Sequence, residues 1–422
     1  MVSKITYRIG DCVQVLKEYP ENHFNACVTD PPYGLGFMGK EWDKDPKAQE
    51  WHEIWAVEVL RVLKPGAHLL AFGGTRTWHR LACALEDAGF EIRDTICWLY
   101  GQGFPKSLDV SKAIDKRMGA EREVISIQEH GGMTPTNTGR YGWNTNETAL
   151  EKTDRIITAP TSDAAKKWSG WGTALKPAFE PIIVARKPLV GTVAENVLKY
   201  GTGGLNIDGG RIGTIAEKPW GKVHPNRGKH PLWDIDEKTV DAPEPHPQGR
   251  WPANVILDEE AAKMLDEQSG ERGPPGGPGR QEEYEVEGRG YLFPHMGNRQ
   301  GPLYLNEKGG ASRFFYTAKA SRGEREMGLG KVKPAGAFRA EDRAPIRNVH
   351  PTVKPLDLMR YLVRLVTPPG GLVLDPFLGS GTTLLACRLE NLNGIGIEKE
   401  VEYEPIIKGR LSSIPPSLEE FE

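Results

Sequence analysis

Short apolar runs alternate with amphipathic helical patterns in residues 7–100, and this alternation constrains the fold more than any other feature. The run 25–29 has the length of a strand and stops at Asp30, whereas the apolar residues of 51–63 recur at helical spacing. The same order continues with a strand, a helix and a strand over 67–72, 75–87 and 91–100. It predicts a doubly wound, mostly parallel sheet with helices on both faces.

Regular patterns return near the end of the chain, in residues 354–411. They predict a helix, a strand, a second helix and a second strand over 356–365, 372–374, 382–390 and 394–397. Between the two ordered parts, residues 101–345 are rich in glycine, proline, asparagine and threonine, with strand-like islands at 179–186 and 251–257. A chain of 422 residues can hold one large α/β domain with a sizeable insertion, or two domains of unequal size.

The tetrapeptide Asp30-Pro31-Pro32-Tyr33 directly follows a predicted strand, at the edge where open α/β sheets bind ligands. Its two prolines fix φ and cannot continue a sheet ladder, so they hold a rigid turn. There the Asp30 carboxylate and the Pro31 carbonyl can accept the two N–H groups of an exocyclic amine while Tyr33 stacks on the base. Such bonding frees the nitrogen lone pair for attack on a sulfonium methyl group. The alternative is a strand terminator with a packed tyrosine, but the rarity of the tetrapeptide favours the functional interpretation.

A second strand-to-helix turn, Asp375-Pro376-Phe377-Leu378-Gly379-Ser380-Gly381-Thr382-Thr383, lies near the C-terminus. Its glycines would let the backbone approach a ligand closely, and the following helix begins with free N–H groups. The alternative is a tight turn with a threonine cap. No lysine follows the second glycine and the G-x-G-x-x-G spacing is absent, so neither a P-loop nor a nicotinamide site fits. Because Glu398 ends the next predicted strand, where an acidic side chain can bind ribose hydroxyls, we expect a cofactor that contains a nucleoside.

With these motifs in this order, the chain resembles the N4/N6 amino-methylating DNA methyltransferases of the permuted type called the beta class. The permutation is visible because the Asp-Pro-Pro-Tyr turn precedes the cofactor turn. The segment Asn348-Val349-His350-Pro351-Thr352-Val353-Lys354-Pro355 corresponds to one that precedes the cofactor turn in that family, and Gly10-Asp11-Cys12-Val13 is similar to its opening motif. The resemblance covers residues 5–100, 176–188 and 348–411.

The resemblance implies a Rossmann-like α/β fold with a mostly parallel seven-stranded sheet, a circularly permuted motif order and a large irregular insertion. Residues 91–100 and 179–186 would form an antiparallel hairpin of that sheet. The implied division is a catalytic half (1–100), an insertion that can contact DNA (101–175), a returning strand (176–188), a target-recognition region (189–345) and a cofactor-binding half (346–422).

The resemblance also implies S-adenosylmethionine as the cofactor and a role for each matching residue. Asp30, Pro31, Pro32 and Tyr33 would be catalytic. The methionine part of the cofactor would meet Asp375, Phe377, Gly379, Gly381 and Thr382, with Thr352 and Lys354 close by, its ribose would meet Glu398, and its adenine would meet Asp11 and Cys12.

A basic stretch, residues 311–339, lies inside the implied target-recognition region and holds seven basic residues against two acidic ones. A local basic surface can bind phosphates although the whole chain has a net charge of −3. Aromatic residues at 314–316 are interleaved with these charges, and the alternative is a solvated loop whose aromatics pack on the core. The residues that we expect to contact DNA are Arg313, Lys319, Arg322 and Arg325.

The implied reaction requires that the target base leave the duplex, because a paired amine cannot reach the methyl donor. No Pro-Cys dipeptide is present, which disfavours the covalent route of cytosine-C5 methylation. Asp30 favours adenine N6, since cytosine-N4 enzymes of this family often carry serine there, and cytosine N4 stays open. The rivals from another class are a catalytically silent DNA-binding protein and a scaffold that binds S-adenosylmethionine for a partner subunit.

Composition limits the setting of this activity. The five cysteines stand singly without a C-x-x-C pair, which fits a reducing compartment and predicts no metal site. No apolar run approaches the roughly 18 residues of a membrane span, and the first residues lack the pattern of a signal peptide. We expect a cytoplasmic protein that binds double-stranded DNA and no membrane. A homodimer is compatible with the sequence, while a restriction-enzyme partner and the recognition sequence have no visible motif.

Overall fold

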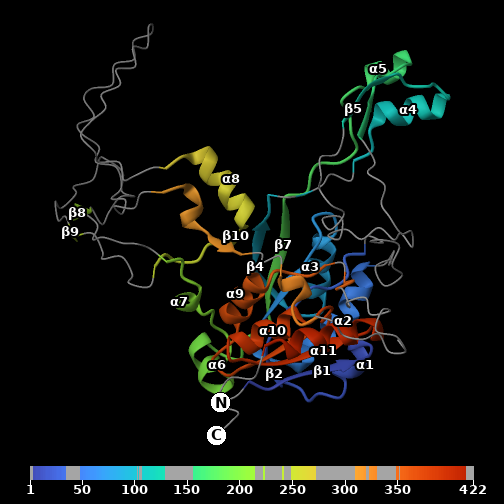
Figure 1. Cartoon of the computed structure of the whole chain (residues 1–422). Coiled ribbons are helices and arrows are strands. Elements are labelled where there is room, and N and C mark those ends of the chain that lie inside the picture. Colours follow the sequence, from blue (N-terminus) through green and yellow to red (C-terminus); the bar gives the residue numbers. More distant parts are fainter. Residues whose placement is uncertain are drawn as a thin grey trace, which may run out of the picture.

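The computed structural model is built around one large sheet (Figure 1). The described residues are 3–34, 48–101, 103, 107–128, 155–213, 222–223, 240–241, 249–271, 309–319, 323–329, 348–350 and 352–414. Within them the sheet has nine strands in the order β1-β13-β12-β2-β3-β7-β4-β10-β11. In that order they span Ile5–Ile9, Asn393–Glu398, Leu372–Asp375, Phe24–Thr29, Leu63–Phe72, Phe179–Arg186, Glu91–Leu99, Val255–Asp258 and Tyr316–Ala318.

The first seven strands of this order correspond to the Rossmann-like sheet expected from the sequence. Two further strands, β10 and β11, extend the β4 edge, so the expected count of seven is corrected to nine in the described part of the chain. Neighbouring strands are parallel except at β7, which is antiparallel to both β3 and β4. Glu91 pairs with Arg186 and Leu99 with Phe179, which confirms the predicted hairpin.

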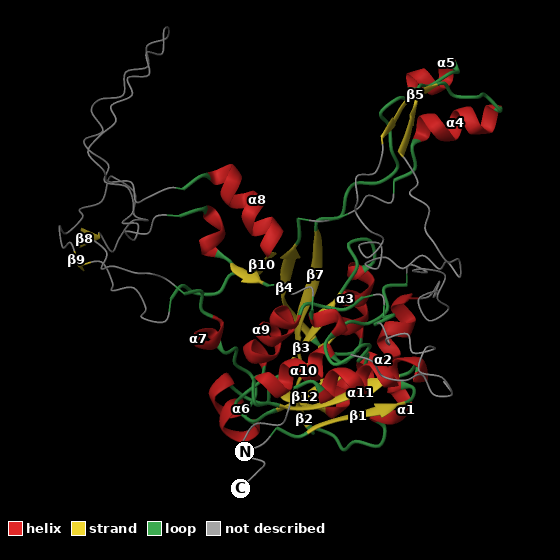
Figure 2. Cartoon of the chain, viewed as in Figure 1, coloured by secondary structure: helices red, strands yellow, loops and turns green. Residues whose placement is uncertain are grey.

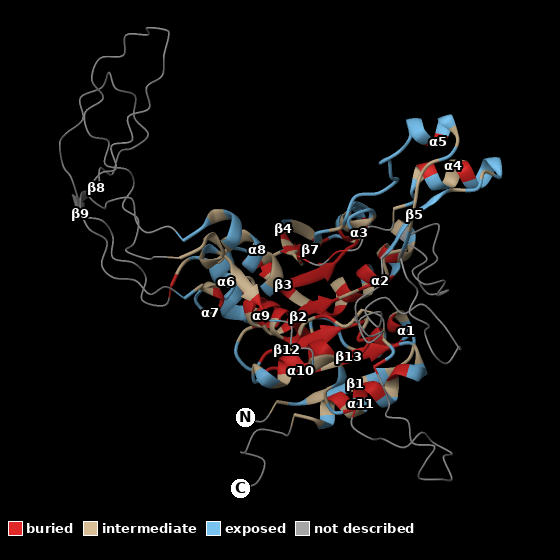
Figure 3. Ribbon diagram, turned by 45° about the horizontal axis from the view of Figure 1, so that its top comes forward, coloured by how far each residue is buried: buried red, intermediate tan, exposed pale blue. Residues whose placement is uncertain are grey.

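Helices cover both faces of the sheet, as the alternating sequence pattern predicts. The predicted helices are α2 (Ala48–Val62), α3 (Trp78–Asp87), α9 (Leu356–Val366) and α10 (Thr382–Leu389), whose ends differ from the predictions by a few residues. Leu70 and Phe72 of β3 pack in one apolar cluster with α9 and α10, whereas Leu69 and Ala71 pack in another with α2, α3 and the short α1 (Cys12–Leu16). Successive side chains of a strand point to opposite faces, so the sheet is the middle of three layers. Figure 3 shows the resulting buried band in red.

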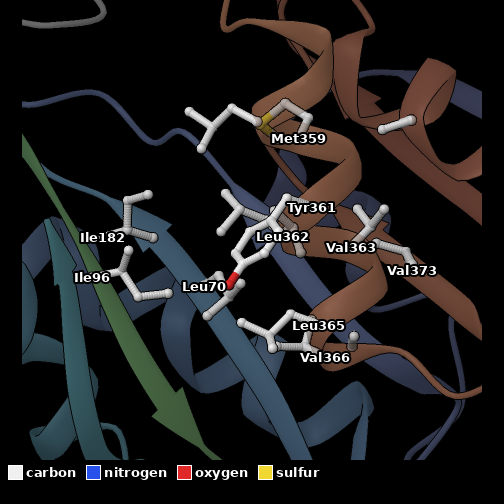
Figure 4. Close-up of a cluster of buried hydrophobic side chains, with 14 of the residues drawn as sticks. Leu70, Ile96, Ile182, Met359, Tyr361, Leu362, Val363, Leu365, Val366 and Val373 are labelled. Carbon is white, nitrogen blue, oxygen red and sulfur yellow. The ribbon is translucent and has the colours of Figure 1, made fainter. Parts of the chain in front are cut away.

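Helix α9 anchors the segment that precedes it. Eight of its eleven residues are buried. Figure 4 shows its side chains, Leu362 and Leu365 among them, beside Leu70 of β3, with Ile96 and Ile182 of the hairpin beyond. Each fully buried side chain of this size contributes about 1.5–3 kcal/mol. Residues 352–355 are therefore held firmly against the carboxyl ends of the central strands.

The predicted insertion at 101–175 contains a folded unit that projects from the sheet at the upper right of Figures 1 and 2. In it α4 (Val110–Met118) packs against α5 (Asp163–Lys167), and β5 (Val124–Gln128) pairs antiparallel with β6 (Arg155–Thr158). Its buried centre is Asp115, whose carboxylate accepts hydrogen bonds from Arg122 Nη1 at 2.7 Å and Ser162 Oγ at 2.6 Å. Hydrogen bonds and an ion pair to Asp115 thus hold this unit together internally.

The described residues of 189–345 join the sheet and its helices at several points. Helix α6 (Val193–Tyr200) packs on β3, where Asn196 Nδ2 donates to the Pro65 carbonyl at 2.9 Å. Helix α7 (Ile207–Gly210) contacts α9, and helix α8 (Glu259–Ser269) lies beside β10. Strands β8 (Lys222–Val223) and β9 (Val240–Asp241) pair with each other in a separate two-stranded sheet. Across the described ranges, every helix is too short or too polar to cross a bilayer.

Candidate active site

The carboxyl ends of β12 and β2 lie side by side at the centre of the sheet. From β12 the chain crosses through α10 to β13 on one side, and from β2 it crosses through α2 to β3 on the other. The crevice between them is the topological switch point, where open α/β sheets bind ligands. Thr29, the last residue of β2, donates its hydroxyl hydrogen to Asp375 Oδ1 at 2.7 Å, although the two residues are 346 positions apart. Both predicted motifs therefore meet at one edge.

The turn Asp30-Pro31-Pro32-Tyr33 keeps its carboxylate and its aromatic ring together. Tyr33 donates its hydroxyl hydrogen to Asp30 Oδ1 at 2.9 Å, and its oxygen lies 3.4 Å from Glu180 Oε2. Gly74, which follows β3, lies against the Tyr33 ring, because a Cβ at Gly74 would stand 3.0 Å from Cδ2 of the tyrosine. Burial and the neighbouring carboxylates raise the pKa of Tyr33 well above its usual value, so its hydroxyl stays protonated.

A buried lysine from the other half of the chain joins this turn. Lys354 Nζ lies 2.6 Å from Asp30 Oδ2, and the lysine side chain is only 8% exposed. Burial by itself disfavours the ammonium form, but two nearby carboxylates outweigh burial, and the pKa of Lys354 is raised. The sequence predicts Lys354 near the cofactor, and its bond to Asp30 is a contact that the sequence does not predict.

Glu180, the second residue of β7, completes the cluster. Its Oε2 lies 3.3 Å from Lys354 Nζ, and its side chain is 25% exposed. Burial raises the pKa of the Glu180 carboxyl, and Lys354 offsets part of that rise. Two carboxylates and one ammonium group give the cluster a formal charge of −1.

Asp375 shapes the second turn from within. Its Oδ1 accepts the Thr29 hydroxyl and the Phe377 N–H, the latter at 3.1 Å, and its Oδ2 accepts the Thr383 hydroxyl at 2.5 Å. The residue is 3% exposed, and burial raises its pKa to about 6. Asp375 therefore ties β2 to the start of α10.

Glycine is required twice in this turn, for two different reasons. Gly379 has a φ of +56°, and a Cβ there would stand 2.7 Å from Nε2 of His350, so the backbone of the turn packs on that imidazole. Gly381 has a φ of +85° with only ordinary contact distances around a Cβ, so its conformation alone favours glycine. The sequence predicts close approach to a ligand, whereas at Gly379 the close neighbour is His350.

Arg410, on α11 (Glu404–Ser412), lies fully buried beneath the same turn. Its Nη1 donates to the Ser380 carbonyl at 2.7 Å and to Thr382 Oγ1 at 2.8 Å. Burial lowers the pKa of Arg410 to about 10, so the guanidinium stays charged at neutral pH. Arg410 therefore stabilises the beginning of α10 through these hydrogen bonds.

Glu398 ends β13 beside the turn and is 7% exposed. Its Oε2 accepts the Gly379 N–H at 2.7 Å, and its Oε1 accepts the Glu400 N–H at 2.8 Å. Burial raises the pKa of the Glu398 carboxyl to about 7. Its backbone carbonyl accepts the Gly10 N–H at 2.8 Å, which brings Asp11 to the same edge.

The chemistry of the side chains at this edge fits a cofactor that contains a nucleoside. A carboxylate oxygen can accept two hydrogen bonds, so Glu398 keeps acceptor capacity for a diol beyond its two backbone bonds. Asp11 is exposed and caps α1, and Cys12 is buried with a pKa raised to about 12 by that burial. Phe377 is half-buried and its ring lies 5.3 Å from that of Trp55, while Thr352 lies half-buried beside His350. Glu398, Asp11 and the Phe377 ring thus lie at the same edge of the sheet.

Of the four residues expected to contact DNA, Arg322 is outside the described residues. Lys319 is exposed just after β11. Arg313 donates to the Gly309 and Gly310 carbonyls, and its guanidinium lies 4.4 Å from the centroid of the Phe314 ring. Arg325 Nη2 donates to the carbonyls of Asn348 and His350 at 3.0 and 2.9 Å, which is a structural role. Phosphate contact by these residues stays a prediction.

Sequence reasoning missed three contributors to the site: Glu180, Gly74 and Arg410. Glu180 carried a signal, because it is the one charged residue at the start of an otherwise apolar strand, next to a proline. Gly74 follows a buried strand, which is a typical position for a close packing contact. No sequence pattern marks Arg410, since its partners lie 28 and 30 positions away.

Comparison with known proteins shows which protein family the chain matches. The model of the N6/N4 methylase family, described as DNA methylase, matches residues 24–409. The Type II methyltransferase M.HindIII of Haemophilus influenzae is 22% identical over 444 residues, which covers 95% of this chain and 93% of that protein. The Type II methyltransferase M2.MboI of Moraxella bovis is 46% identical over 69 residues, or 16% of this chain and 25% of that protein.

Solved structures of similar proteins share less of the sequence. The cytosine-N4-specific PvuII DNA methyltransferase is 14% identical with a TM-score of 0.44, and the match covers 97% of this chain and 87% of that one. The M1.HpyAVI-SAM complex is 16% identical with a TM-score of 0.36, and the match covers 96% of this chain and 99% of that one.

Proposed function

The chain belongs to the N6/N4 DNA methylase family, and from this premise we propose that it transfers a methyl group to the exocyclic N6 amine of adenine in DNA. One observation carries the proposal. The Asp30-Tyr33 turn and the turn after Asp375 share the switch point of the sheet, and a 2.7 Å hydrogen bond between Thr29 and Asp375 joins them. A carboxylate that binds an amine thus stands beside a turn suited to a nucleoside cofactor.

Asp30 would hold the amine. Because each carboxylate oxygen can accept more than one hydrogen bond, Asp30 can accept an N–H of the amine while it keeps Tyr33 and Lys354. The Pro31 carbonyl would accept the second N–H. Bonds to both hydrogens draw the nitrogen lone pair out of conjugation with the base, so that it can attack an electrophilic carbon. Tyr33 would stack on the base, and its position against Gly74 fixes the plane of the ring.

S-adenosylmethionine is the methyl donor, and when bound it supplies a sulfonium methyl group. Glu398 would bind its ribose hydroxyls, and Asp11 with Cys12 would lie toward its adenine. Asp375 would act by shaping the turn rather than by exposing its carboxylate, because all three of its hydrogen bonds are internal. The residues proposed to line the methionine part are Phe377, Gly379, Gly381 and Thr382, with Thr352 nearby.

Double-stranded DNA is the proposed partner, with the target base flipped out of the helix to reach Asp30. Adenine is favoured over cytosine because aspartate at the first position of the tetrapeptide is the more usual residue in adenine enzymes. The same geometry suits the N4 amine of cytosine, so the identity of the base needs its own measurement.

That measurement uses the full chain, labelled S-adenosylmethionine and double-stranded DNA of mixed sequence. After incubation the DNA is digested to nucleosides, and the modified base is identified by chromatography and mass. We expect labelled N6-methyladenine. Labelled N4-methylcytosine would overturn the choice of base, and DNA without label would overturn the proposed activity.

A further inference from the structure

Asp30, Lys354 and Glu180 form a continuous chain of ionisable groups that leads away from the base-binding turn. Lys354 Nζ lies 2.6 Å from Asp30 Oδ2 and 3.3 Å from Glu180 Oε2. The three side chains are 17%, 8% and 25% exposed in the order Asp30, Lys354, Glu180, so the far end of the chain is nearest to water. Tyr33, 3.4 Å from Glu180 Oε2, is the other titratable group that faces Glu180 among the described residues.

The proposed reaction releases a proton that this cluster must receive. The amine lone pair forms the new N–CH3 bond, the S–CH3 bond of the donor breaks, and its electron pair stays on sulfur. The amine nitrogen is then cationic and must lose one hydrogen as a proton. Asp30 is the base that the proposal places against that nitrogen, so the proton arrives there first.

Asp30 is a poor final site for this proton. With Glu180 ionised, the cluster carries a net charge of −1 before the transfer and is neutral afterwards. A proton that stayed on Asp30 would block the acceptor of the next amine. An ammonium group that lies between two carboxylates can instead give a proton to one and take a proton from the other, and it is unchanged at the end.

We infer that Glu180 is the final acceptor of the amine proton and that Lys354 relays it from Asp30. In this step Lys354 Nζ gives a proton to Glu180 Oε2 and takes the one held by Asp30, which returns Asp30 to its carboxylate form. Burial raises the pKa of the Glu180 carboxyl, so it holds a proton more readily than an exposed glutamate. Glu180 acts through Lys354 and is therefore a positioning residue rather than one that touches the base.

The inference rests on the proposed function, and its test compares single-turnover methyl transfer in wild type, Glu180→Gln and Glu180→Asp from pH 4 to 8, with cofactor saturating at every pH. The amide of Glu180→Gln still accepts a hydrogen bond from Lys354 but cannot take a proton. The cluster would then end with a net charge of +1, so we expect the rate at neutral pH to fall by about 100-fold, a usual contribution of proton transfer. The exposed Glu267, on α8, gives the matched control Glu267→Gln, which should keep the wild-type rate.

The pH profile separates proton acceptance from a merely structural role. In wild type the rate should rise with pH through the Glu180 titration, with a midpoint above the ordinary value for glutamate. Glu180→Gln should lose that limb, and Glu180→Asp should restore it. Cofactor dissociation constants and melting temperatures of all variants show whether the site is intact.

Several results would overturn the inference alone, provided that wild type methylates DNA. These are a Glu180→Gln rate close to that of wild type, a lowered rate that keeps the acidic limb unchanged, and a Glu180→Asp variant that behaves like Glu180→Gln. If Glu180→Gln does not fold, a wild-type rate that is independent of pH over this range overturns it. A wild type that leaves DNA unlabelled overturns the proposed function as well.

Discussion

Asp30 uses both carboxylate oxygens within the protein, one toward the Tyr33 hydroxyl and one toward the Lys354 ammonium group. These bonds fix the orientation of the carboxylate, because one oxygen has a partner in the same turn and the other has a partner just before α9. A carboxylate held in this way loses little further freedom when it binds an amine, which is the advantage of a preorganised site. The same bonds mean that replacing Asp30 changes the surroundings of Lys354.

Replacing Asp30 with alanine should abolish methyl transfer while cofactor binding stays near the wild-type value. The amine loses its main acceptor, and we expect the single-turnover rate to fall by at least about 100-fold. Single-turnover kinetics and calorimetric cofactor titration check the two parts of this expectation. The exposed Asp87, at the end of α3, provides the control Asp87→Ala. An Asp30→Ala variant with undiminished turnover would contradict the proposed site.

Cofactor binding should weaken as the pH falls through the titration of Glu398. Burial raises the pKa of this carboxyl to about 7, and a ribose hydroxyl donates its hydrogen to the ionised form. Protonation removes that acceptor, so the dissociation constant should rise by about tenfold from pH 8 to pH 6. Calorimetric titration across this range measures the change.

The control for this measurement is Glu398→Gln, which cannot titrate. The α-amino group of the cofactor itself has an ordinary pKa near 7.7–8.0. Any pH dependence that remains in Glu398→Gln therefore belongs to the ligand and is subtracted. If wild type and Glu398→Gln follow the same profile, Glu398 does not bind the ribose as proposed.

At the scale of elements, the turn between β12 and α10 depends on its packing against the segment before α9. Gly379→Ala would place a Cβ within 2.7 Å of the His350 ring, in a backbone conformation with φ of +56°. We expect weaker cofactor binding, because the turn or the imidazole must move. Gly370 supplies a matched control, since its φ is +67° and a Cβ there would meet nothing within 4 Å.

Both alanine variants should lose about 1–2 kcal/mol of unfolding free energy from the left-handed conformation. Only Gly379→Ala should also raise the cofactor dissociation constant. Denaturant unfolding and cofactor titration on the two variants separate the shared backbone effect from the local contact. Equal cofactor affinity in both would refute the assignment of this turn to the cofactor.

The elements of the sheet could be predicted from the sequence because each is encoded locally. The apolar run of β2, the helical spacing of α2 and the glycines after β12 are patterns within ten to fifteen residues, and each was placed within a few positions. The hairpin of β4 and β7 was predicted because its two apolar strands stand out from a polar region. Strand β11 was missed, since its three residues, Tyr316–Ala318, lie in a basic stretch without alternation.

The composition of the site could be predicted only in part, because several of its contacts join distant parts of the chain. Asp30 and Asp375 were found from their local motifs, but the bond from Lys354 to Asp30 spans 324 positions and the Glu180 contact spans 147 positions to Tyr33. Those distances are set by the order of strands in the sheet. A single sequence does not encode that order in any local pattern, so the contacts of Glu180 with Tyr33 and Lys354 are seen only in three dimensions.

At the scale of the whole molecule, a net charge of −3 means that attraction to DNA must come from local surfaces. The basic stretch 311–339 was predicted as one such surface, and its described cations divide into two kinds. Arg325 is committed to the carbonyls of Asn348 and His350, so it stabilises the segment that carries Lys354. Lys319 is exposed just after β11, so it is the described residue of this stretch that we predict to contact a phosphate.

This division predicts that two neutralising substitutions affect different properties, DNA binding in one case and stability in the other. Lys319→Gln should leave the melting temperature unchanged and make the dependence of DNA affinity on salt less steep by about 0.9 in log–log slope, the value for one phosphate contact. Arg325→Gln should lower the melting temperature, because the substitution removes the hydrogen bonds that Arg325 donates to two backbone carbonyls. DNA titrations at several salt concentrations and thermal unfolding of both variants provide the measurement. If Lys319→Gln keeps the full salt slope, the DNA-contacting surface lies elsewhere, and the cations of the projecting α4–α5 unit, Lys116, Arg117, Lys166 and Lys167, are the next to neutralise.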